Sequence, residues 1–83
     1  MIQNGFDEID IHNMTKIQAI AAIDAKLKRA NPSCYRIRVI HGYHNGIVLR
    51  DAVRKEYKHN PKVIRVEVGL NQGETDLVLR DLV

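Results

Sequence analysis

Residues 39–50 read Val-Ile-His-Gly-Tyr-His-Asn-Gly-Ile-Val-Leu-Arg, and this stretch decides the fold of the chain. An apolar β-branched run ends in a loop with two glycines and two histidines, and a helical pattern follows at once. The free N–H groups and the dipole at the start of a helix favour an anion above such a strand end. The segment therefore predicts a strand, a phosphate-sized loop and a helix, with His41 and His44 adding side chains that exchange protons near neutral pH.

The residues before this segment predict another strand and another helix. Phe6 to His12 alternates between apolar and polar residues, as a half-buried strand does. Thr15 followed three residues later by Gln18 is the signature of a capping box, so a helix should begin there and end at residues 31–33. Its apolar stripe is expected to contain Ile17, Ile20, Ile23, Leu27 and Ala30.

The remaining elements follow from the same patterns. The strand that enters the glycine loop covers residues 34–41. The helix that leaves it spans about 47–59, stops before an Asn-Pro pair and is expected to bury Leu49, Ala52, Val53 and Tyr57. Residues 63–68 and 76–82 read as two further strands, which loop 69–74 joins in an apparent hairpin. The order of elements is therefore βαβαββ.

This order predicts an α/β fold, a two-layer sandwich in which one face of the sheet is bare. If the first three strands are parallel and added in one direction, right-handed crossovers place both helices on the same face. Alternation directs Ile64, Val66 and Val68 to the helix side in the third strand, and Leu77 and Leu79 in the fourth. The open face is then expected to carry Glu8, Asp10, His12, Arg36, Arg38, Arg65 and Arg80.

Composition limits the kind of site that the chain can hold. Its 83 residues suffice for one domain with little room for an internal cavity, so a site should lie at a surface cleft or a strand end. A net charge of +3 is compatible with a polyanionic partner without requiring one. The single cysteine, Cys34, excludes an internal disulfide and a multi-thiolate zinc site. Because no charged and apolar leader and no membrane-length apolar run is present, we expect a cytoplasmic protein without a membrane partner.

Two short motifs resemble those of a known family. The first motif reads Asp10, Ile11, His12 and Asn13, and the second reads His41, Gly42, Tyr43, His44, Asn45 and Gly46, followed by Leu49 and Arg50. Together they resemble the small MutS-related (Smr) domain in its short stand-alone version, whose motifs are Asp-apolar-His-Gly and His-Gly-x-Gly-x-Gly followed by Leu-Arg. Asn13 and His44 stand where the family has glycine. The resemblance covers residues 6–83 as an Smr-like domain and leaves residues 1–5 as an N-terminal extension.

The resemblance implies a fold and a function. The fold would be a mixed four-stranded sheet similar to the C-terminal domain of translation initiation factor three, with the last strand antiparallel. The function would be binding of DNA or RNA, including branched or structured forms, with endonuclease activity that nicks the phosphodiester backbone. The catalytic residues would be Asp10, His12 and His41. The residues that hold phosphate or nucleic acid would be Gly42, Tyr43, His44, Asn45, Gly46, Arg36, Arg38, Arg50 and Arg54.

The roles within such a site would differ from residue to residue. His41 or His12 would activate water or a ribose hydroxyl. Asp10 would orient the histidine or recruit a divalent cation such as magnesium or manganese. The amides of residues 42–46 would hold the phosphate. The sequence leaves metal-dependent hydrolysis and a metal-free histidine mechanism both open.

Each assignment has a structural alternative. The glycine loop is also explained as a tight turn whose glycines supply positive φ angles. Asp10 and His12 emerge on the same face of a strand and form either a catalytic pair or a solvated one, with Arg38 as a further partner for Asp10. The open-face arginines either track a phosphate backbone or keep the sheet face charged. Tyr43 either stacks on an unpaired base or packs against its own helix, and the four histidines lack the spacing of a zinc site.

Two other functions therefore stand beside the nuclease. A non-catalytic module would bind structured nucleic acid without cutting it. A protein-interaction adaptor would present its sheet edge or its open face to an acidic partner. Nicking and retardation assays on plasmid and labelled nucleic acid separate the three functions. The nuclease cuts, the binding module retards nucleic acid without cutting it, and the adaptor does neither.

Overall fold

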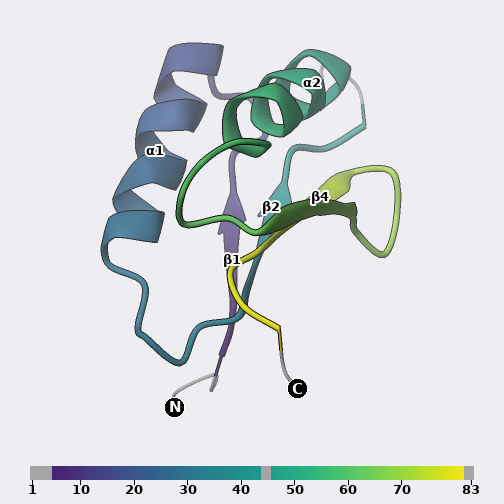
Figure 1. Ribbon diagram of the computed structural model, residues 1–83. Coiled ribbons are helices and arrows are strands. Elements are labelled where there is room, and N and C mark those ends of the chain that lie inside the picture. The colour runs from purple at the N-terminus through teal and green to yellow at the C-terminus, as the bar shows by residue number, and fades with distance from the viewer. Residues whose placement is uncertain (1–4, 44–45, 82–83) are drawn as a thin grey trace.

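The computed structural model describes residues 5–43 and 46–81 and contains six elements in the expected order (Figure 1). The strands are β1 (Phe6–Asp10), β2 (Arg36–Ile40), β3 (Arg65–Val68) and β4 (Glu74–Val78), and the helices are α1 (Lys16–Lys28) and α2 (Gly46–Tyr57). The strands form one sheet in the order β1-β2-β4-β3. β1 is parallel to β2, whereas β4 is antiparallel to both of its neighbours. The βαβαββ order and the antiparallel last strand are thus confirmed.

The core lies between the helices and one face of the sheet. It is built from Ala19, Ile23 and Leu27 of α1, Leu49, Val53 and Tyr57 of α2, and Ile37, Val39 and Leu77 of the sheet. The Tyr57 hydroxyl donates to the Asp24 carboxylate at 2.6 Å and so joins the two helices. In the described ranges, neither helix is both long and apolar enough to cross a membrane.

The start of α1 is capped as the sequence predicts. Thr15 Oγ1 accepts the Gln18 backbone N–H at 3.1 Å, and Gln18 Oε1 accepts the Thr15 backbone N–H at 3.0 Å. The expected apolar stripe is wrong at Ile17, whose side chain is 82% exposed. Ala19 is buried instead. The buried positions of α1 repeat every four residues from Ala19, so Ile17 lies at the solvent-exposed edge of the apolar stripe.

β3 is one of the two edge strands of the sheet, and the helical layer covers it only in part. Val66 packs against the core, as alternation predicts. Ile64 and Val68 share its side of the chain but are 50% and 67% exposed. This free edge therefore combines unpaired backbone groups with apolar side chains.

Candidate functional site

The first motif places an exposed carboxylate beside an exposed imidazole at the carboxyl end of β1. Ile11 turns inward and is fully buried, so Asp10 and His12 emerge together on the other side. Asp10 Oδ1 accepts the His12 backbone N–H at 3.0 Å and also contacts His12 Nδ1. These hydrogen bonds from His12 hold the pKa of Asp10 below its usual value. An imidazole that donates Nδ1–H to a carboxylate presents Nε2 as its free nitrogen, as a general base must.

The second motif meets the first at Gly42. The φ angle of Gly42 is +84°, and a Cβ at this glycine would lie 3.5 Å from the Cβ of His12. Asn13 has a φ of +67°, in the left-handed region that asparagine adopts more readily than most residues. That conformation explains why a glycine of the family pattern can be an asparagine here. The two motifs thus form one continuous surface around His12.

A surface hollow of about 400 Å³ lies where the motifs meet. Its walls are residues 12–16, residues 41–43, and Val48 and Leu49 of α2. Lys16 is exposed on the first turn of α1, and Tyr43 is 61% exposed. The Tyr43 ring lies against the loop between β3 and β4, since a Cβ at Gly73 would be 3.3 Å from its Cε2. Sequence reasoning missed Lys16, although its place directly after the helix cap puts it near His12.

His41 is buried, whereas the sequence predicts a catalytic histidine at a surface cleft or a strand end. Only 2% of the residue is exposed. The alternation that turns Ile37 and Val39 towards the helices continues two residues further and turns His41 inward as well. Its Nε2 lies 2.9 Å from Thr75 Oγ1, and its Nδ1 lies 3.2 Å from the carbonyl oxygen of Gly42. His41 is therefore a hydrogen-bonded core residue in this structure, and it does not present a free nitrogen to the hollow.

Arg54 and Arg50 reinforce the neutral state of this histidine. Arg54 Nε donates to Thr75 Oγ1 at 3.2 Å, whereas Arg50 Nε donates to Asp51 at 3.1 Å. Burial lowers the pKa of His41, and the positive charges of Arg54 and Arg50 lower it further. Both arginines were expected to hold nucleic acid, and in the structure each already has a hydrogen-bond partner within the chain.

We expect the free energy of unfolding to fall as the pH drops below about 6.5. The folded pKa of His41 lies below its ordinary value of 6.5, so the unfolded chain binds a proton first. This contribution to stability is complete above that value and is lost on acidification towards the folded pKa. The variant His41→Gln should weaken the dependence of the urea-unfolding free energy on pH below about 6.5. The exposed His59, changed to Gln, is the control, and an unaltered slope in His41→Gln would contradict the assignment.

The glycine loop does not offer the amide donor that was expected at Gly42. The backbone N–H groups of His41 and Gly42 both donate to the Gly73 carbonyl, at 2.9 and 3.0 Å. The expectation that the Gly42 amide is free to hold a phosphate is therefore wrong. Gly46 is the first residue of α2, and the predicted contacts of His44 and Asn45 lie outside the described residues.

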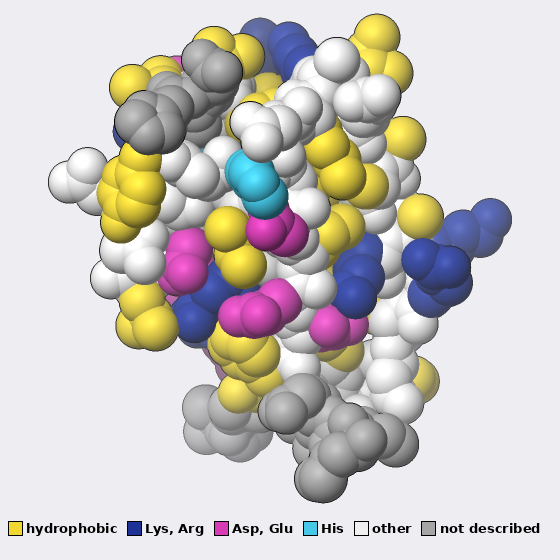
Figure 2. Space-filling view, turned by 180° about the vertical axis from the view of Figure 1, so that it is seen from behind, with side chains coloured by type: hydrophobic (Ala, Val, Ile, Leu, Met, Phe, Trp, Pro, Cys, Tyr) yellow, Lys and Arg dark blue, Asp and Glu magenta, His cyan; other side chains and the backbone are white. Residues whose placement is uncertain are grey.

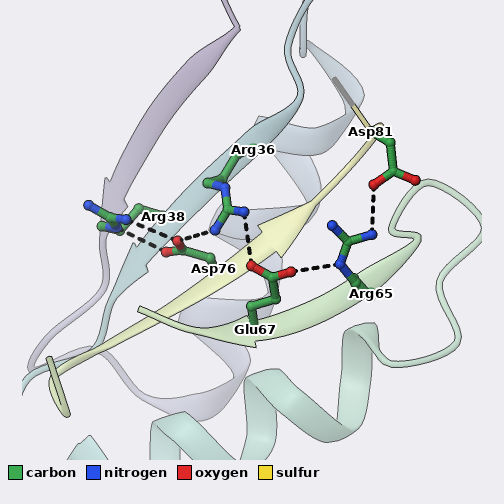
Figure 3. Close-up of polar contacts among 6 residues, drawn as sticks. All are labelled: Arg36, Arg38, Arg65, Glu67, Asp76 and Asp81. Atoms are coloured by element: carbon green, nitrogen blue, oxygen red, sulfur yellow. Dashed lines mark hydrogen bonds and ion pairs between the residues drawn. The ribbon is translucent and has the colours of Figure 1, made fainter. Parts of the chain in front are cut away.

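On the open face, Asp76 binds two arginines that were expected to meet phosphates (Figure 3). Asp76 is 1% exposed, and it accepts hydrogen bonds from Arg36 Nη1 at 2.6 Å and from Arg38 Nε and Nη2 at 2.9 and 3.0 Å. Burial alone would raise the pKa of Asp76, but the hydrogen bonds from Arg38 and Arg36 outweigh it and hold the pKa below the usual value. Both guanidinium groups are thus committed to a buried carboxylate.

Arg65 belongs to the same network. Glu67 accepts hydrogen bonds from Arg36 at 2.9 Å and from Arg65 at 2.6 Å, and Arg65 also binds Asp81 at 2.8 Å. Figure 2 shows the result, a face on which acidic and basic side chains lie next to one another. Arg38 was expected to pair with Asp10, but carboxylates of β3, β4 and the segment after β4 bind these arginines instead. Arg80 is exposed beyond the end of β4.

The donor set at the first motif does not fit a divalent cation. In residues 5–43 and 46–81, no three His, Cys, Asp or Glu side chains converge as metal ligands would. Asp10 and His12 supply only two donors, and these bind each other. Magnesium and manganese therefore have no built site among the described residues.

Comparisons with known proteins agree with the two motifs and with the fold. The family model for the Smr domain matches residues 9–76. The Smr domain of Thermus thermophilus MutS2, a crystal structure, superposes with a TM-score of 0.79 at 25% sequence identity, over 90% of this chain and 99% of that one. Among curated proteins none matches the chain. Because the family model spans most of the sequence and includes the whole site, the chain belongs to the Smr domain family.

Proposed function

We propose that this domain binds nucleic acid at the hollow and cleaves a phosphodiester bond there with His12 as the general base. The observation that supports this function is the exposed Asp10 and His12 pair at the rim of the hollow. The carboxylate keeps the proton on Nδ1 and would stabilise the imidazolium that forms when Nε2 accepts a proton. That proton comes from the attacking oxygen, either of water or of a ribose hydroxyl, as its bond to phosphorus forms and the bond to the leaving oxygen breaks.

The substrate phosphate would lie beside the first turn of α1. Lys16 supplies a positive charge at this position, and the turn contains no acidic residue that would oppose an anion. Tyr43, exposed on the opposite wall, offers a face on which an unpaired base can stack. Arg36, Arg38 and Arg65 play no part in this arrangement, because carboxylates of the chain already bind them.

Binding without cleavage is the second candidate, and one observation favours it. Efficient phosphodiester cleavage calls for an acid that protonates the leaving oxygen as well as a base. Of the described histidines in the two motifs, only His12 exposes its imidazole at the hollow, since the side chain of His41 is buried and hydrogen-bonded to Thr75. A site with one exposed imidazole would bind nucleic acid and cut it slowly or not at all.

The two functions separate in one experiment on the intact protein. Supercoiled plasmid and a labelled hairpin RNA are incubated with increasing protein, in chelator and in magnesium or manganese. Nicked plasmid or cut RNA supports the nuclease, whereas retardation of uncut nucleic acid supports the binding module. The absence of both cleavage and retardation would overturn the proposal and favour the adaptor.

A further inference from the structure

The free edge strand has a sequence that is symmetric in its chemistry about Val66. Ile64 and Val68 are apolar and flank it on the helix side, whereas Arg65 and Glu67 carry opposite charges on the open face. A second copy of β3 laid antiparallel and centred on Val66 would set Ile64 against Val68, and Arg65 against Glu67. Two-fold symmetry makes each of these contacts twice. The strand is thus complementary to itself.

The hydrogen-bonding pattern of the β3 backbone also fits a strand pair centred on Val66. The Gly69 N–H donates to the Glu74 carbonyl at 3.2 Å, which fixes the phase of the ladder between β3 and β4. Because hydrogen-bonded residues alternate along an antiparallel strand, Arg65 and Glu67 bond towards β4, and Val66 and Val68 point their backbone groups away from the sheet. In a pair centred on Val66, the two copies of Val66 therefore exchange both hydrogen bonds. Arg65 and Glu67 then occupy the positions where opposing side chains come closest.

This edge also lacks two of the usual protections against pairing. Exposed edge strands normally carry lysine, proline or a bulge that keeps other strands away. Residues 64–68 contain neither lysine nor proline, and residues 65–68 pair with β4 in a continuous register, although the Ile64 N–H just before the strand turns back to the Val78 carbonyl at 2.8 Å. The exposed Leu70, directly after the strand, extends the apolar side.

We propose that two copies of the chain associate through β3 and form one continuous sheet with the order β1-β2-β4-β3-β3-β4-β2-β1. The network of Figure 3 would then cross the interface, because Glu67 would face Arg65 of the second copy. Such a contact between short strands is small, so the dimer is weak and depends on protein concentration. No residue that lines the hollow takes part, and this inference is therefore independent of the proposed function.

Sedimentation equilibrium over a wide concentration range tests the dimer. The wild-type mass should rise with concentration from 9.5 kDa towards twice that value. Val68→Asp places two charges in the apolar pairs and should raise the dissociation constant about tenfold or more. The side chain of Val68 is mostly exposed, so the thermal transition should survive. Ile17→Asp is the matched control, since it makes the same kind of change at an exposed site on α1.

A charge exchange tests the register. Arg65→Glu places a carboxylate opposite Glu67 of the second copy and should weaken the dimer. Adding Glu67→Arg restores opposite charges and should restore association. Failure of the double variant to restore association would exclude the Val66-centred pairing. A wild type that stays monomeric up to about 1 mM would overturn the proposal. The edge would then fit an acidic strand of another protein, which Arg54 and Lys58 in the adjoining groove would attract.

Discussion

Replacing Asp76 with alanine should destabilise the fold by about 3 kcal/mol or more. The carboxylate is almost wholly buried and binds the guanidinium groups of Arg36 and Arg38 from one position. Its loss leaves two partly buried positive charges close together, which costs more than the loss of the hydrogen bonds alone. For a domain of this size, the melting temperature should fall by roughly 12 °C or more, which calorimetry or circular dichroism would measure.

Asp81 provides the matched control for this prediction. It binds Arg65 at 2.8 Å, a distance similar to those at Asp76, but it lies on the exposed rim of the same network. An exposed ion pair contributes little, so Asp81→Ala should change the unfolding free energy by less than about 1 kcal/mol. Equal losses in the two variants would show that burial does not set the strength of this network.

The second large effect is expected at His12. If the domain cleaves nucleic acid as proposed, His12→Ala should slow cleavage about 10²- to 10⁴-fold, because the proton-accepting nitrogen is gone. Affinity should change far less, since the proposal assigns the binding of the phosphate chiefly to the start of α1. Single-turnover rates with protein in excess, together with retardation of uncut substrate, measure the two quantities separately.

Two further variants define the chemistry at His12. Asp10→Asn keeps the shape of the side chain but removes the charge that orients the imidazole, so it should also slow cleavage while the fold is kept. His59→Ala removes an exposed histidine from beyond the end of α2 and should have no effect. Cleavage at the wild-type rate by His12→Ala would remove this residue from the mechanism and point to the glycine loop.

The sequence predicted those features that depend on local spacing. The capping box at Thr15, the alternation along β2 and the hairpin between the last two strands all follow from residues within a few positions of one another. The proximity of the two motifs followed from the rule that parallel strands place their carboxyl ends at the same edge of a sheet. The meeting of the two motifs at one edge was therefore predictable from short patterns alone.

The errors concern contacts that depend on how distant strands align. Asp76 was not recognised as the partner of Arg38, because the pairing requires the exact antiparallel register of β2 and β4. The burial of His41 was accessible from alternation, but the glycine that follows made a surface loop the more natural interpretation. The Gly42 amide is occupied by a carbonyl more than thirty residues away in the sequence. No local sequence pattern predicts this hydrogen bond.

The Gly73 carbonyl connects the turn before β4 to residues that line the hollow. One oxygen accepts the amides of both His41 and Gly42, so these two residues stay tied to the turn before β4 while that turn is closed. We expect the two segments to open together, with a frequency set by the stability of the hairpin. A sequence change in residues 69–72 would therefore alter how long the wall beside His12 remains formed, even though it touches neither motif.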